Sequence, residues 1–158
     1  AREEAVVSEA IARCVVFKAD VVAEDKTESR GVRECLNYGH TLGHAVEALA
    51  GYGTFSHGAA VAEGMRFAAR LAAALAGASL EFVAAQDDLL DALGLPALVW
   101  SAEPADLLAA MKRDKKARHG QVCFVLPRDV GSWELRDVDD AVILEHLEAW
   151  ARSKEECS

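Results

Sequence analysis

The sequence has little proline, few aromatic residues and a shortage of positive charge. Only 3 of its 158 residues are proline, aromatic residues make up 6%, and 17 Lys and Arg stand against 26 Asp and Glu, giving a formal net charge of -9. Nucleic acids and anionic membrane surfaces are bound through basic faces, so neither is expected as a partner. The hydrophobic content of 52% is enough for a core in a chain of about one ordinary domain.

Further absences narrow the class of protein. No apolar run reaches the ~20 residues of a membrane-spanning helix, since Arg70 interrupts the alanine-rich stretch. The four cysteines form no C-x-x-C pair, which argues against a zinc finger or a redox dithiol. No signal-peptide pattern opens the chain. No strand leads into a glycine-rich phosphate turn, so this chain is not expected to hold a dinucleotide by itself. We expect a cytoplasmic protein with reduced thiols.

The apolar spacing that is present is mostly helical. We expect a mainly α fold, a single helical metal-binding domain over residues 1–158 with a small β-hairpin near the C-terminus. Ser79 is the expected N-cap of one helix and Asp137 of the last. Helices are predicted at about residues 3–24, 32–49 and 79–93. A further helix is predicted to end near residue 76, and two others to begin near residues 104 and 137. The hairpin strands are predicted at 121–126 and 132–136.

Three of the five histidines lie in one short stretch. His40 and His44 would share a helix face, and His57 could return to them after a loop. Neutral imidazole is the commonest ligand for divalent transition metals, so the spacing predicts a metal site. The alternative is a set of partly buried, hydrogen-bonded histidines. Gly39 and Gly43 weaken that alternative, because glycines inside a helix mark the close approach of another backbone or a ligand.

Residues 18–22, 36–47 and 57–65 resemble the C-terminal domain of 3-dehydroquinate synthases, and Asp114-Lys115-Lys116 is similar to a later signature of that family. The pattern departs from the family at Ala59, where a glutamate is usual, and in the loop before Arg33, which is one residue longer. The resemblance implies that an N-terminal NAD-binding domain and a glutamate metal ligand belong to sequence upstream of this chain. The chain is therefore expected to be part of a longer enzyme and inactive alone.

The resemblance also implies a reaction and a set of site residues. Members convert 3-deoxy-D-arabino-heptulosonate 7-phosphate to 3-dehydroquinate with loss of phosphate, a step of the shikimate pathway, using NAD and a divalent metal, zinc or cobalt. His40 and His57 would be metal ligands, whereas His44 would transfer a proton and contact substrate. Without the resemblance, both His40 and His44 would be taken as ligands.

The remaining implied residues are mostly cationic. Lys18 and Arg33 would bind the substrate carboxylate, with Lys18 also catalytic, and Asn37 would donate to the phosphate. Glu28 would support Lys18. Each of these is an ordinary surface residue when taken singly. The cations at 112–118 would, without the resemblance, be a solvated helix end, but the resemblance places Lys115 and Lys116 against the substrate.

Three other functions remain open from the sequence. A related sugar-phosphate cyclase or an iron-type polyol dehydrogenase would share a helical metal-binding domain, although relatives whose substrates lack a carboxylate have less use for Arg33. A non-catalytic metal-binding domain is the third. The expected partners are a phosphorylated sugar-acid substrate and the missing NAD-binding domain, and a homodimer is compatible with the sequence without being required by it.

Overall fold

A computed structural model describes residues 2–27, 31–114 and 121–155 of the chain. It divides the chain into two compact units, Ala1–Asn37 and Tyr38–Ser158. The first unit contains helix α1 (Arg2–Glu24) and the short 3-10 helix η1 (Val32–Asn37). Asp25, which is 1% exposed, follows α1 and accepts a hydrogen bond from the Val32 N–H at 3.2 Å, tying the start of η1 to the end of α1.

The helix predicted at 3–24 is confirmed as α1. The apolar residues on which this prediction rested are nevertheless largely exposed. Val7, Ile11 and Val15 keep 48%, 59% and 63% of their surface accessible. The spacing therefore predicted the helix correctly without identifying what its apolar side packs against.

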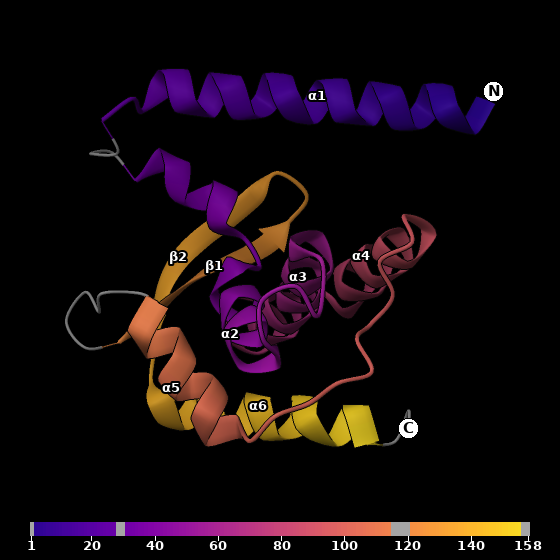
Figure 1. Cartoon of the computed structure of the whole chain (residues 1–158). Coiled ribbons are helices and arrows are strands. Elements are labelled where there is room, and N and C mark those ends of the chain that lie inside the picture. The colour runs from indigo at the N-terminus through magenta and orange to yellow at the C-terminus, as the bar shows by residue number, and fades with distance from the viewer. Residues whose placement is uncertain (1, 28–30, 115–120, 156–158) are drawn as a thin grey trace. The chain divides into compact units, whose positions relative to one another are not determined.

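The second unit contains the remaining helices and strands (Figure 1). It also contains the hydrophobic core. Helix α2 packs against both α3 and α5, strand β1 and helix α4 pack against α3, and α6 packs against α5. Fully buried side chains from these elements, among them Leu42, Leu71, Leu107, Phe124 and Leu147, form one cluster. The elements are α2 (His40–Ala50), α3 (His57–Leu75), α4 (Leu80–Ala92), α5 (Pro104–Asp114), β1 (Val122–Asp129), β2 (Ser132–Val138) and α6 (Asp140–Glu155).

The expected mainly α fold with a hairpin near the C-terminus is confirmed. β1 and β2 pair antiparallel, with Phe124 opposite Arg136 and an irregularity between Pro127 and Asp129. Ser79 caps α4 as predicted, its hydroxyl accepting the Phe82 N–H at 3.1 Å. Among the described residues, no helix combines the length and apolar character needed to cross a membrane.

Two predicted helix starts are wrong. The helix expected over residues 32–49 is broken, because Gly39 adopts a left-handed φ of 79° and α2 begins only at His40. Asn37 therefore lies in η1 and not one turn before His40 on the same helix. Asp137 pairs with Cys123 within the hairpin, so it cannot cap α6, which begins at Asp140. Local sequence favoured both starts, but close backbone packing in the first case and strand pairing in the second overrode it.

Candidate metal centre

The crossing of α2 and α3 brings the histidines together. A Cβ atom on Gly64 of α3 would lie 1.8 Å from the Gly39 carbonyl oxygen, and one on Gly43 of α2 would lie 3.1 Å from the Ala60 carbonyl oxygen. Only glycine allows the two backbones to approach this closely. The sequence expectation that Gly39 and Gly43 mark a close approach is confirmed, and the approaching group is the backbone of α3.

The loop after α2 delivers His57 to the first position of α3. Gly51 and Gly53, with φ of 87° and 92°, take the backbone out of α2 through conformations that other residues rarely adopt. Ser56 then caps α3, its hydroxyl accepting the Ala59 N–H at 3.2 Å. His57 thus sits at the N-terminal end of α3, beside the helix that carries His40 and His44.

The three imidazole rings face a common space. The ring centroids of His40 and His44 are 5.3 Å apart, those of His40 and His57 are 5.3 Å apart, and those of His44 and His57 are 5.9 Å apart. One ligand nitrogen from each ring lies within 4.8 Å of the other two. His40 and His44 are half-buried and His57 is exposed. Three imidazole nitrogens at this separation suit zinc or cobalt, which favour such ligands.

The rings of His40 and His57 each have one nitrogen next to an oxygen that can only accept a hydrogen bond. The Nδ1 of His40 is 3.1 Å from the Tyr38 carbonyl oxygen, and the Nδ1 of His57 is 3.2 Å from each carboxylate oxygen of Glu47. In a neutral ring, Nδ1 must then carry the proton and Nε2 keeps its lone pair. Such oxygen partners typically orient metal-binding histidines. Sequence reasoning missed Glu47, although its position about one turn after His44 was a local signal.

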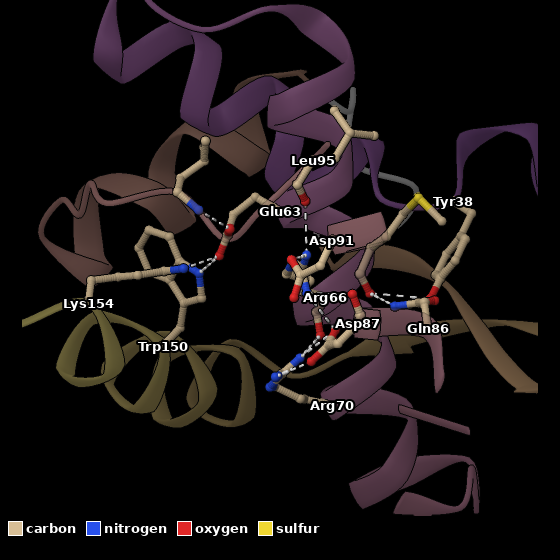
Figure 2. A network of polar contacts seen from close by, with 12 residues as sticks. Tyr38, Glu63, Arg66, Arg70, Gln86, Asp87, Asp91, Leu95, Trp150 and Lys154 are labelled. Atoms are coloured by element: carbon tan, nitrogen blue, oxygen red, sulfur yellow. Dashed lines mark hydrogen bonds and ion pairs between the residues drawn. The ribbon is translucent and has the colours of Figure 1, made fainter. Parts of the chain in front are cut away.

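The Tyr38 backbone that supports His40 is held by its own side chain. The Tyr38 hydroxyl donates to the Gln86 side-chain oxygen from α4, and Gln86 in turn donates to the Met65 carbonyl of α3 at 3.2 Å (Figure 2). Burial raises the pKa of the Tyr38 hydroxyl, the hydrogen bond with Gln86 opposes that shift, and the charge of Asp87 adds to it. The hydroxyl therefore stays protonated and acts as a donor that fixes the start of α2.

A cavity of about 440 Å³ adjoins His44 and is lined by His44, Glu47, Ala48, Tyr52, Ala110 and Arg113. The sequence grouped Arg113 with a solvated cationic helix end. In the fold, this residue near the end of α5 shares the cavity with His44. A guanidinium at this position can bind an anionic oxygen of a ligand that also reaches His44.

The other predicted site residues belong to the first unit or lie outside the described residues. Lys18, Arg33 and Asn37 all belong to the first unit. Lys18 is exposed on α1, and Asn37 donates to Glu34 at 3.2 Å. Arg33 lines a cavity of about 110 Å³ together with Asp25 and Asn37. Glu28, Lys115 and Lys116 lie outside the described residues.

A second polar cluster, built around Glu63, locks α3 to α6. Glu63 is 2% exposed and accepts from the Trp150 indole N–H at 2.5 Å, the Lys154 ammonium at 2.5 Å and the Leu98 N–H at 2.9 Å (Figure 2). Nearby, Arg66 bridges Asp91 and the Leu95 carbonyl at 2.7 and 2.9 Å. These contacts hold α3, the helix that begins with His57, against α6 and α4.

Comparison with known proteins gives a consistent set of relatives. The family model described as 3-dehydroquinate synthase C-terminal matches residues 1–117. The 3-dehydroquinate synthase of Desulforamulus reducens is 45% identical over 139 residues, covering 83% of this chain and 37% of the relative. That of Xylella fastidiosa (strain M12) is 44% identical over 154 residues, covering 93% of this chain and 41% of the relative. The chain therefore spans about two fifths of the length of these curated relatives.

Solved structures match the same fold. A crystal structure of 2-deoxy-scyllo-inosose synthase, complexed with carbaglucose-6-phosphate, NAD⁺ and Co²⁺, superposes with a TM-score of 0.74 at 28% identity, covering 86% of this chain and 40% of that one. A 2-epi-5-epi-valiolone synthase from Streptomyces hygroscopicus, with NAD⁺ and Zn²⁺ bound, has a TM-score of 0.74 at 24% identity over 90% of this chain and 39% of that one, a likeness of fold alone.

Proposed function

Since the chain belongs to the 3-dehydroquinate synthase family, we propose that it supplies the metal- and substrate-binding half of an enzyme that converts 3-deoxy-D-arabino-heptulosonate 7-phosphate to 3-dehydroquinate, eliminating phosphate. The observation that carries the proposal is the trio of imidazoles within 4.8 Å, with Nδ1 of both His40 and His57 held by an acceptor oxygen. The 44–45% identity to synthases of this name supports the choice of reaction.

In this proposal His40 and His57 would hold the metal, each with the Nε2 lone pair that its Nδ1 contact leaves available. When bound there, a zinc or cobalt ion would act as a Lewis acid that lowers the pKa of the substrate hydroxyls. His44 contacts the substrate and transfers a proton, because its ring is close enough to the same space to reach a hydroxyl held beside the two ligands. The third ligand is a glutamate contributed by the part of the enzyme upstream of residue 1.

The redox part of the reaction is assigned to the upstream domain. NAD bound there would accept and return a hydride, and none of the residues of this chain is assigned to its binding. The crystal structure of 2-deoxy-scyllo-inosose synthase contains NAD⁺ and Co²⁺ together, which supports a cofactor and a metal that work in one cleft. The missing upstream domain is thus the main partner that we propose.

Cations of the chain would bind the anionic ends of the substrate. Arg113 lines the cavity beside His44 and adds a guanidinium that the sequence pattern did not assign to the site. Lys18, Arg33 and Asn37 in the first unit, with Lys115 and Lys116, complete the proposed substrate-binding set, and Glu28 supports Lys18. Guanidinium binds carboxylate or phosphate with two parallel hydrogen bonds, which fixes orientation as well as charge.

A second candidate is a related sugar-phosphate cyclase. The superposition on 2-deoxy-scyllo-inosose synthase with a TM-score of 0.74 supports it. The lower identity of 28%, against 45% for the Desulforamulus reducens relative, favours the dehydroquinate reaction. The two candidates are distinguished by the substrate that the complete enzyme consumes. A phosphorylated sugar with a carboxylate indicates the dehydroquinate reaction, and one without a carboxylate indicates a related cyclase.

The metal assignment is tested by zinc calorimetry on single-histidine variants. We expect His40→Ala and His57→Ala to abolish binding and His44→Ala to leave it near normal, because only the first two rings are proposed ligands. Binding should be weak even in the wild type, since one ligand of the proposed set lies upstream. His146→Ala on α6 is the matched control, as this histidine is outside the trio. If zinc binding is retained in His57→Ala and lost in His44→Ala, the metal ligands are His40 and His44, and the proposed assignment of His57 is wrong.

A further inference from the structure

We propose that Glu47 is a positioning residue for His57: its carboxylate holds the Nδ1 proton of His57, so that Nε2 faces His40 and His44 as a metal-binding nitrogen. The inference rests on the proposed metal centre and extends it by one residue that neither the sequence pattern nor the comparisons assign. It predicts that metal affinity depends on a side chain that does not itself touch the metal.

The carboxylate of Glu47 contacts the imidazole of His57 symmetrically, and the two residues belong to different helices. Glu47 is on α2 and His57 starts α3, and both carboxylate oxygens lie 3.2 Å from Nδ1. A carboxylate that shares one N–H between its two oxygens limits rotation of the imidazole ring as well as selecting its tautomer. The same contact links the end of one helix to the start of the other, in addition to the crossing at Gly43 and Gly64.

The two proposed ligands differ in how they are oriented. His40 is half-buried and its Nδ1 faces a backbone carbonyl, that of Tyr38. The side chain of His57 is 57% exposed, so little packing restrains its ring, whereas the Glu47 side chain is only 15% exposed. Among the residues that the structure describes, Glu47 supplies the hydrogen-bond acceptors recorded for His57. His57 therefore depends on Glu47 for an orientation that His40 obtains from the backbone.

The charge of Glu47 has a second effect. A carboxylate on the far nitrogen of an imidazole raises the electron density at the near one and makes it a better ligand, which a neutral acceptor does less well. Glu47→Gln keeps an acceptor oxygen but removes the charge, and Glu47→Ala removes both. The two variants separate orientation from charge.

The first test reads the tautomer directly and needs no metal. In nitrogen-15 spectra at mildly alkaline pH, we expect wild-type His57 to carry its proton on Nδ1. Glu47→Ala should shift it to Nε2, the form that a solvated imidazole prefers, and Glu47→Gln should retain the Nδ1 form. An Nε2 proton in the wild type, or an unchanged tautomer in Glu47→Ala, would overturn the inference.

The second test reads metal affinity and geometry. We expect the zinc dissociation constant to rise 10–100-fold in Glu47→Ala, as for other residues that support a metal ligand, and less in Glu47→Gln. The visible spectrum of the cobalt-loaded protein should keep its band pattern, since the ligand number is unchanged. Glu148→Ala, which removes an exposed carboxylate of α6, controls for net charge and should bind as the wild type does.

The outcomes separate this inference from the proposed function. A wild-type chain that binds no zinc would contradict the metal centre, while the tautomer would still decide the role of Glu47. Normal zinc affinity in Glu47→Ala, together with loss in His57→Ala, would overturn the positioning role and leave the metal centre intact. A cobalt spectrum that loses a ligand in Glu47→Ala would make Glu47 a ligand itself, which contradicts the inference.

Discussion

At the scale of single residues, the buried Glu63 shows how the fold tolerates a carboxylate in its interior. Its oxygens accept from an ammonium, an indole N–H and a backbone N–H, on Lys154, Trp150 and Leu98. Burial of a charge is costly unless it is paired and hydrogen-bonded, and all three donors are supplied by parts of the chain distant from α3 in sequence. Glu63 therefore holds α6 and the segment before α5 against α3.

We predict that Glu63→Ala is strongly destabilising. It removes the acceptor of the buried Trp150 indole N–H and of the part-buried Leu98 N–H. It also removes the counter-charge of the nearly buried Lys154, whose side chain is 8% exposed. Breaking a buried pair in this way typically costs about 3–5 kcal/mol. Urea unfolding measures the loss. Glu148→Ala, at an exposed pair with Arg152 on α6, should change stability by no more than about 0.5 kcal/mol. A Glu63→Ala loss as small as that of the control would contradict this account.

The sequence predicted some of these residues and not others for a physical reason. His40 and His44 are one helical turn apart, so their shared face follows from local geometry. Glu63 and Trp150 are 87 positions apart, and nothing near either of them indicates the other. Glu47 combines a local and a distant relation. It is close to His44 in sequence, but its contact is with His57, which follows a loop whose path could not be predicted from the sequence.

At the scale of elements, the α2–α3 crossing depends on glycine. The absence of a side chain on Gly64 lets the Gly39 carbonyl oxygen approach, while Gly58, on the same helix, has no atom within 4 Å of a would-be Cβ. Both glycines are in α3. Only one of them is required by packing.

We predict opposite effects for the two glycine-to-alanine changes in α3. Gly64→Ala should lower stability by at least about 1–3 kcal/mol, the usual cost of overpacking, and should weaken zinc binding because His57 moves away from His40. Gly58→Ala should leave stability unchanged or raise it by up to about 1 kcal/mol through helix propensity. Thermal unfolding and zinc calorimetry measure both. Equal stability of the two variants would show that the close approach does not constrain the helices.

The spacing of apolar residues predicted most of the helices, but it did not predict the break before α2. Helices α1, α4 and α5 were predicted because apolar spacing, the Ser79 cap and the first-turn Pro104 are local signals. Gly39 could equally have been a helix-interior glycine. Its left-handed φ of 79° is selected by contact with Gly64, which local sequence does not encode. Asp137 failed for the same reason, since strand pairing with Cys123 outweighed its capping tendency.

At the scale of the whole molecule, the chain matches only one part of its relatives. It covers 37–41% of the length of two curated relatives, and the sequence contains no glycine-rich nucleotide turn. The family could be predicted because residues 36–47 form a dense pattern. The upstream half could not be derived from these residues, only implied by their resemblance to a longer enzyme.

We predict that the isolated chain does not turn over the heptulosonate phosphate, even with NAD and zinc. The proposed reaction needs the cofactor and a further metal ligand from upstream sequence, held in the same cleft. Phosphate release measures this directly. A longer polypeptide that spans the full length of the relatives is the positive control, and phosphate release by the chain of 158 residues alone would contradict the proposed division of labour.

The glycine crossing of α2 and α3 would also separate binding of the proposed metal from folding. The spacing of His40, His44 and His57 is set by backbone contact at Gly39, Gly43 and Gly64, and by core side chains such as Leu42 and Val46, rather than by the ion. The entropy lost in gathering the rings is then incurred when the chain folds. A zinc finger, by contrast, gathers its ligands only when the metal binds. In the absence of zinc the domain would hence already be folded with the proposed centre ready to bind the ion, and a chelator would empty that centre without unfolding the domain.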